Sequence, residues 1–200
     1  MPPEIPNNRR PEHSVDPLFT DRWSPRAFDG SEMPVETLMT ILEAGRWAPS
    51  SYNSQPWRFV WGRRGTPAFD AILSILVPFN QGWCRDASAL VVLASSETMV
   101  PPGASDPVPS KTHSFDAGSA WMAAAIQAHQ LGWYTHGMVG LDFGQAAETL
   151  KVPLGFAVEM AFAIGKRGDP ATLPEAIRGR EFPSDRKPMA ELAFEGAFPG

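Results

Sequence analysis

The sequence has a single cysteine, Cys84, among its 200 residues. One cysteine cannot form an intrachain disulfide, and it cannot supply a cluster of thiolates to a metal ion. We expect Cys84 to be a buried, unreactive thiol, because a charged pair and then an apolar run follow it. The histidines also lack a third ligand at metal-binding spacing, so no metal site is expected.

The sequence also lacks blocks of like charge, although 17 basic and 22 acidic residues give a formal net charge of −5. An acidic chain without a basic block is unlike a general nucleic-acid binder. Residues 117–141 contain no Asp, Glu, Lys or Arg, but their His, Gln and Gly content is too polar for a membrane span. The first 17 residues lack the apolar segment of a signal peptide. We therefore expect a cytoplasmic protein that binds neither nucleic acid nor membranes.

Several common fingerprints of catalysis and nucleotide binding are missing. No GxGxxG follows a predicted strand, no GxxxxGK[ST] occurs, and GxSxG is absent as well. The two common nucleotide-binding loops and the nucleophile elbow are therefore excluded. No acid–base pair, catalytic triad or metal cluster stands out either.

What the sequence does contain is enough apolar material for a core, since 43% of its residues are hydrophobic and 20% are charged. Its 21 prolines, about twice the average share, predict many loops and extended segments. We predict a single domain over residues 1–200, with an irregular arm at 1–16 and an extended C-terminal tail at 183–200.

Apolar periodicity and helix-capping residues predict the secondary structure. Helices are expected at 35–47, 67–77, 115–131 and 143–150, and strands at 57–61, 89–94 and 156–164. Residues 100–110 and everything after 165 are expected to be loop and tail. Helices interleaved with a few strands, without regular βαβ alternation, favour an α+β layered domain over a doubly wound sheet. Three tryptophans are expected in the core: Trp47, Trp57 and Trp61.

The first candidate site is the segment 22–26, Arg-Trp-Ser-Pro-Arg. Alternate side chains of an extended chain point to one side, so Arg22, Ser24 and Arg26 would share a face. Guanidinium groups match phosphate oxygens in pairs, which suits this segment to an anion. A solvated arginine pair on a loop is the alternative interpretation.

The second candidate site is the segment 48–57, APSSYNSQPW, directly after a predicted helix. The amides of Asn53 and Gln55 offer a donor and an acceptor side by side, as recognition of a flat heterocycle requires. An ordinary turn is the alternative, because Pro, Ser and Asn favour turns.

Three shorter segments are further candidates. Asn80 lies among aromatic residues and can contact a ring, while its neighbour Trp83 is either a ring contact or simply core. The segment 135–142 holds His136 and glycines that let the backbone approach a ligand, although a strand that ends in a turn looks similar. The tail carries a basic pair that is either a ligand contact or part of a solvated terminus: Arg186 and Lys187.

Together and in this order, these segments resemble the nitroreductase family of FMN-dependent oxidoreductases. The resemblance covers residues 17–190, and its most specific part is R-x-S-x-R followed by a helix and then APSSYNSQPW. It implies an α+β, nitroreductase-like layered sandwich with a central, mostly antiparallel sheet flanked by helices. It also implies an intertwined homodimer with two FMN sites at the interface.

The resemblance assigns roles to the candidate segments. The segment 22–26 would hold the flavin from one subunit, and the segment 49–55 would reach it from the other. Asn80 would contact the pyrimidine edge, the backbone of 138–140 would face the reactive N5, and the tail would clamp the phosphate. The implied cofactor-binding residues are Arg22, Trp23, Ser24, Arg26, Pro49, Ser50, Ser51, Asn53, Gln55, Asn80, Met138, Val139, Gly140, Arg186 and Lys187.

Two positions depart from the family pattern, because Val139 stands where many relatives carry Glu and Trp83 stands where some carry Lys. Both changes would leave the substrate pocket more apolar, while Val139 can still offer its backbone N–H. The implied function is the FMN-dependent reduction of a small electrophile, nitroaromatic or quinone-like, by NADH or NADPH in a ping-pong hydride transfer. The alternatives are a flavin-binding module without turnover and a biosynthetic flavin dehydrogenase or oxidase. No side chain is expected to be catalytic, since flavin N5 would be the reactive centre, with Trp83 and His136 as pocket candidates.

Overall fold

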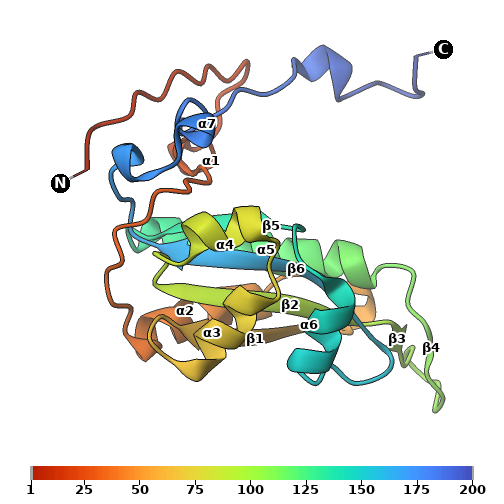
Figure 1. Cartoon of the computed structure of the whole chain (residues 1–200). Coiled ribbons are helices and arrows are strands. Elements are labelled where there is room, and N and C mark those ends of the chain that lie inside the picture. The colour runs from red at the N-terminus through yellow and green to blue at the C-terminus, as the bar shows by residue number, and fades with distance from the viewer. Residues whose placement is uncertain (1, 200) are drawn as a thin grey trace.

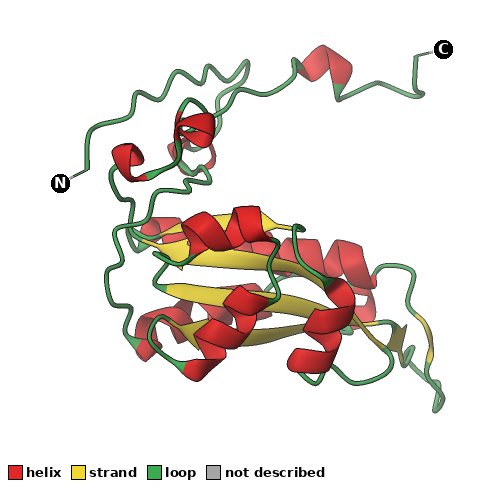
Figure 2. Cartoon of the chain, in the orientation of Figure 1, coloured by secondary structure: helices red, strands yellow, loops and turns green. Residues whose placement is uncertain are grey.

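A four-stranded sheet forms the centre of the computed structural model, which describes residues 2–199. Every neighbouring pair of strands is antiparallel, and helices cover both faces (Figure 2). The expected α+β sandwich with an antiparallel sheet is therefore confirmed. In spatial order the strands are β1 (Trp57–Arg63), β2 (Ala89–Ser96), β6 (Phe156–Gly165) and β5 (Tyr134–Met138).

Helices lie on both faces of the sheet (Figure 1). Each set of helices encloses a separate apolar cluster. Helices α2 (Val35–Arg46) and α5 (His113–Gln130) pack on one face. The other face is covered by α3 (Pro67–Ser74), α4 (Pro78–Cys84) and α6 (Phe143–Thr149). Alternate residues of β2 enter the two clusters, which explains why its sequence is an apolar run without polar alternation.

Proline and capping residues set the helix boundaries. Helix α2 begins directly after Pro34, and the Oγ1 of Thr66 accepts a hydrogen bond from Phe69 N (3.3 Å) at the start of α3. The helix expected at 67–77 ends at Ser74, and a second short helix, α4, follows it. Pro78 explains this break, because it holds Val77 in an extended conformation (φ −62°, ψ 150°).

The two terminal segments lie beside each other outside the sandwich (Figure 1). Helix α1 (Pro17–Asp21) follows the N-terminal arm. The C-terminal segment is more ordered than the loop expected after 165, because α7 (Glu175–Arg178) puts Ile177 into the core. The backbone N–H of Met189 donates to Glu12 Oε1 (3.0 Å), which joins arm and tail directly. Short 3-10 turns complete the irregular regions: η1 (Ser51–Asn53), η2 (Pro170–Thr172) and η3 (Met189–Glu191).

Two expectations about individual segments need correction. The loop at 100–110 is bordered by a two-residue strand pair, β3 (Thr98–Met99) and β4 (Val108–Pro109). Trp47 is 74% exposed, because it is the C-cap of α2 and lies beyond the helix face that packs on the sheet. Among residues 2–199, none of the helices has the length and apolar character that crossing a membrane requires.

Candidate functional site

A buried carboxylate fixes the segment 22–26 in place. Glu181 is 5% exposed, and its Oε1 accepts hydrogen bonds from the backbone N–H groups of Arg26 (2.7 Å) and Ala27 (2.8 Å). Its other oxygen lies 4.0 Å from Arg26 Nη1. The C-terminal segment therefore determines the position of the first arginine motif.

Five arginines line a hollow of about 320 Å³ beside this segment, which we call the basic hollow. They come from the N-terminal arm, from the 22–26 segment and from the C-terminal segment that follows α7, which meet here. Phosphate and carboxylate groups are the ligands that guanidinium groups bind best. The residues of the basic hollow are Arg9, Arg22, Trp23, Ser24, Arg26, His136, Arg180, Phe182, Ser184 and Arg186.

The arginines of the basic hollow repel one another. Burial first, and then the charges of Arg9 and Arg186, lower the pKa of Arg22 below its ordinary value. Since guanidinium groups stay protonated in proteins, this lowering reports unfavourable energy rather than loss of charge. An anion bound between Arg9, Arg22 and Arg186 would remove that repulsion.

His136 contributes no positive charge to the basic hollow at neutral pH. Burial first, and then the nearby Arg26, lower the pKa of His136 to about 4. Its Nδ1 lies 3.0 Å from the carbonyl oxygen of Pro25. A carbonyl only accepts hydrogen bonds, so Nδ1 of the neutral ring carries the proton and Nε2 remains an acceptor.

A second hollow, of about 390 Å³, adjoins the first and is mostly apolar; we call it the apolar cleft. It lies between α5, the end of β5 and the middle of β6. Arg22 and Ser24 line both hollows, so one extended ligand can occupy both. The residues of the apolar cleft are Arg22, Ser24, Trp121, Met122, Ala125, Gly137, Met138, Val139 and Met160.

A rigid turn closes one end of the apolar cleft. Val139, which is 68% exposed, begins the turn, and the carbonyl of Gly140 accepts hydrogen bonds from Asn80 Nδ2 (2.9 Å) and Val77 N (3.0 Å). A Cβ on Gly140 would lie 2.4 Å from Asn80 Nδ2, so a larger residue here would displace the Asn80 side chain from this hydrogen bond. Asn80 thus fixes the position of the turn through this hydrogen bond.

Two residues of α4 belong to the core. Trp83 is 3% exposed and its ring lies beneath His136, with the ring centroids 4.7 Å apart. Trp83 lines neither hollow and lies in the core, which is the second of the two interpretations that the sequence left open. Cys84 is fully buried, and burial raises the pKa of its thiol, as expected for an unreactive cysteine.

The segment 49–55 lies elsewhere, at the start of α5. The backbone N–H of Ser51 donates to Asp116 Oδ2 (3.1 Å) on that helix. Three residues of the segment have a left-handed backbone, with φ between 48° and 54°: Tyr52, Asn53 and Gln55. This conformation costs about 1 kcal/mol or more for a residue with a side chain, so it persists only where the surroundings impose it.

The chain does not bring its own segment 49–55 to its own arginines. Asp116, which holds Ser51, and Ala125, which lines the apolar cleft, are nine residues apart on α5. A helix rises 1.5 Å per residue, so about 13 Å separates them along the axis. None of the five candidate residues of this segment lines either hollow: Pro49, Ser50, Ser51, Asn53 and Gln55.

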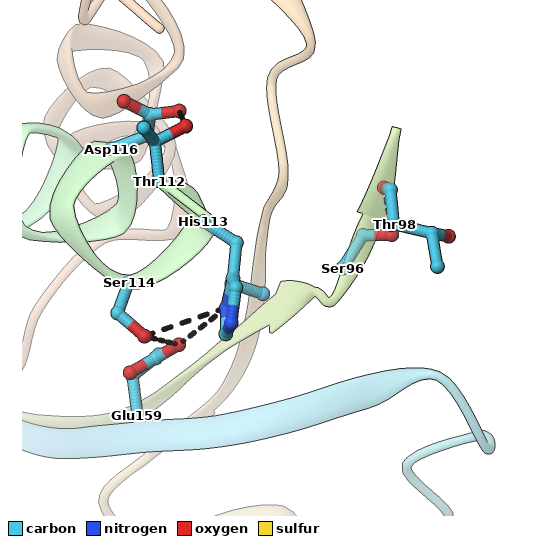
Figure 3. Close-up of polar contacts among 8 residues, drawn as sticks. Ser96, Thr98, Thr112, His113, Ser114, Asp116 and Glu159 are labelled. Carbon is cyan, nitrogen blue, oxygen red and sulfur yellow. Dashed lines mark hydrogen bonds and ion pairs between the residues drawn. The ribbon is translucent and has the colours of Figure 1, made fainter. Parts of the chain in front are cut away.

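A polar cluster anchors the start of α5 to the sheet (Figure 3). Glu159 Oε1 accepts a hydrogen bond from Ser114 Oγ (2.9 Å) and lies 3.2 Å from His113 Nδ1. Ser95 Oγ contacts both His113 and Glu159. The register of β2 and β6 shifts here, and a β-bulge of this kind turns a side chain toward a new face. This cluster explains the polar residue within the apolar run of β6.

The two basic residues of the tail behave differently. Arg186 lines the basic hollow, and its Nη1 donates to Ser184 Oγ (3.2 Å). Lys187 instead forms an exposed ion pair with Glu191 (3.2 Å), one helical turn further along. The structure thus brings Arg186, and not Lys187, to the first arginine motif.

Sequence reasoning missed several residues of this region. Arg9 and Arg180 lie outside any motif, and Glu181 is 155 residues from the backbone N–H of Arg26 that it binds. Trp121 and Met160 are ordinary apolar positions of a helix and a strand, which no pattern separates from the core.

Comparison with known proteins identifies the family. A family model for the nitroreductase family matches residues 19–66, which include both main motifs. An oxidoreductase containing FMN, known from a crystal structure, is 48% identical, with a TM-score of 0.93 over 98% of this chain and 99% of that chain. The chain belongs to the nitroreductase family.

More distant relatives agree with membership of the nitroreductase family. A protein from Desulfovibrio desulfuricans in complex with FMN is 25% identical, with a TM-score of 0.69 over 93% of this chain and 100% of that chain. The chloronitrobenzene nitroreductase of Comamonas testosteroni is 41% identical over 44 residues, or 22% of this chain. The chain matches 19% of the length of that curated relative.

Proposed function

We propose that this nitroreductase-family protein is an FMN-dependent oxidoreductase that uses NADH or NADPH to reduce a small electrophile, such as a nitroaromatic or a quinone. The observation that carries the proposal is that the basic hollow and the apolar cleft share Arg22 and Ser24. One ligand can therefore place an anionic group in the first and a flat ring in the second.

The donor set fits FMN on physical grounds. A phosphate dianion needs fixed positive charge, and Arg22 and Arg186 provide it in an otherwise acidic chain. A flavin ring needs an apolar slot, and Trp121, Met138 and Met160 line one. The neutral His136 adds a hydrogen-bond acceptor to the basic hollow without adding charge.

FMN, when bound, supplies the hydride chemistry at its N5 atom, and the protein supplies binding, orientation and electrostatics. Arg22 and Arg186 would hold the phosphate, and the side chains of Trp121 and Met160 would exclude water from one side of the ring. Because Asn80 fixes the turn at 139–140 through its hydrogen bond to Gly140, the backbone of that turn would be a rigid contact for the ring. The exposed apolar Val139 leaves the substrate side of the turn uncharged.

A second copy of the chain would complete the site. The segment 49–55 lies at the opposite end of α5 from Arg22, so a two-fold partner is the simplest source of its contribution. Phe115 (79% exposed) and Met122 (38% exposed) give α5 an uncovered apolar face in the single chain. A homodimer that packs along α5 would bury this face and bring 49–55 of one protomer to the hollows of its partner.

Anaerobic titration with NADH and NADPH tests the proposal. FMN-loaded protein should lose its yellow absorbance on addition of one or both nicotinamides, and a quinone or nitroaromatic should restore it. A flavin-binding module would stay yellow with both. A biosynthetic dehydrogenase or oxidase would react slowly with nicotinamides and quickly with its own substrate. Failure to bind FMN would overturn the proposal altogether.

A further inference from the structure

The N-terminal arm enters the basic hollow through Arg9. The Nε of Arg9 donates to the carbonyl of Ser184 in the tail (2.8 Å). Its Nη1 donates to the carbonyls of Thr20 and Arg22, both at 2.8 Å. Arg9 therefore joins the arm to α1, to the first arginine motif and to the tail at once, and its guanidinium is held in one orientation.

The hydrogen bonds of Arg9 leave part of its guanidinium available. A guanidinium has five N–H donors, and the three bonds to carbonyls use Nε and both hydrogens of Nη1. Among residues 2–199, no acceptor is hydrogen-bonded to Nη2. Arg9 lines the same hollow as Arg22 and Arg186, so these two donors are available to a ligand there.

The neighbouring Arg10 offers an internal contrast. It is exposed and does not line the basic hollow, and within residues 2–199 its side chain donates only to the carbonyl of Arg9 (Nη1, 3.0 Å). Both residues carry the same charge on the same stretch of chain. Any effect of the general electrostatic field of the arm would therefore be shared by Arg9 and Arg10.

The charges around Arg9 are not balanced within the chain. Burial first, and then the charge of Arg186, lower the pKa of Arg9, while Asp185 and Asp21 partly oppose this. Burial first, and then the charges of Arg9 and Arg186, lower the pKa of Arg22. Three cations that line one hollow favour a multivalent anion between them.

We propose that Arg9 is a phosphate ligand of the FMN site, so that the bound phosphate ties the N-terminal arm and the C-terminal tail to the 22–26 segment. This inference rests on the proposed function, because it takes the phosphate to be that of FMN. It adds a binding residue from a segment that carries no motif. It also makes the order of the arm depend on the ligand.

A comparison of FMN with riboflavin tests the role of Arg9. Riboflavin has the same ring and ribityl chain but no phosphate, so a phosphate ligand affects only the binding of FMN. Arg9→Gln should weaken FMN binding roughly tenfold to a hundredfold, the effect of a lost charge-assisted hydrogen bond. Riboflavin affinity should stay within about twofold, and Arg10→Gln should change neither ligand. Arg9→Lys, which keeps the charge but not the fork, should fall between wild type and Arg9→Gln.

Hydrogen exchange gives a second readout that does not need an affinity for riboflavin. FMN should slow exchange of the amides of residues 4–13 in the wild type, and it should do so much less in Arg9→Gln. Equal weakening of FMN and riboflavin, or equal protection of the arm in both proteins, would show that Arg9 only braces the fold. Unchanged FMN affinity in Arg9→Gln would also overturn the inference. A wild-type protein that binds neither flavin would instead refute the proposed function.

Discussion

Removal of the Glu181 carboxylate should destabilise the fold and loosen the candidate site together. Glu181 Oε1 accepts the backbone N–H groups of Arg26 (2.7 Å) and Ala27 (2.8 Å), and Ala27 is 1% exposed. Glu181→Ala would leave both donors without their acceptor, one in a buried and one in a partly buried position. Glu181→Gln would keep an oxygen acceptor of the same shape but remove its charge.

The magnitude follows from these two hydrogen bonds. A hydrogen bond to a charged group contributes about 1.5–3 kcal/mol, and water or relaxation recovers part of two such losses. We expect Glu181→Ala to lower the free energy of unfolding by about 3 kcal/mol, and Glu181→Gln by about 1–2 kcal/mol. For a chain of this size, 3 kcal/mol corresponds to a fall in Tm of roughly 6–12 °C.

Urea denaturation and thermal melting at one protein concentration measure both variants. Glu195→Ala is the control, because it removes the same charge from an exposed position of the same C-terminal segment. FMN affinity should fall in Glu181→Ala, since Arg26 loses its anchor. Equal stability of Glu181→Ala and Glu195→Ala would refute the reasoning, because the two backbone bonds would then contribute nothing.

Three further predictions concern pH, assembly and the tail. The pKa of His136, lowered to about 4 from an unfolded value near 6.5, makes the neutral ring part of the native state. Stability should therefore be full above pH 6.5 and fall by about 3 kcal/mol on acidification to pH 4, and this loss should vanish in His136→Phe but persist in His13→Asn. Gly118 lies on the exposed side of α5, where a Cβ would meet nothing within 4 Å, so Gly118→Arg should yield monomers in sedimentation. The control variant Gly82→Arg, at an equally open position on α4, should remain dimeric. Dimers in both variants would refute packing along α5. Deletion of residues 183–200 should weaken FMN binding strongly, while deletion of 189–200 should not, because only the longer deletion removes Arg186. If the two truncated proteins bind FMN with equal affinity, Arg186 does not contribute to FMN binding.

Local chemistry in the sequence predicted the main elements well. Thr66 followed by Pro67 predicted the start of α3, and the apolar run at 89–94 predicted the central strand β2. Both predictions succeeded because helix capping and strand burial depend on a few neighbouring residues. Helix α4 was missed, since seven residues that begin with proline and contain Gly82 show no periodicity. Trp47 was misplaced because apolar spacing does not say where the packed face of a helix ends.

The candidate site was predictable only in part. Arg22 and Arg26 carry a recognisable spacing, and the structure places both on the basic hollow with the distant Arg186. Arg9 and Glu181 have no such pattern, because their roles arise from contacts between segments that are far apart in sequence. No local rule of spacing predicts which residues of the arm and tail will meet. The position of 49–55 at the far end of α5 likewise follows from the tertiary fold.

A crystal structure of the protein with FMN tests the central claim most directly, which is that the basic hollow and the apolar cleft form one flavin site. The account predicts the phosphate among Arg9, Arg22 and Arg186, the ring against Met138 and Trp121, and the segment 49–55 of a second protomer against the same ring. A phosphate bound away from Arg22, or a ring that lies outside the apolar cleft, would contradict it.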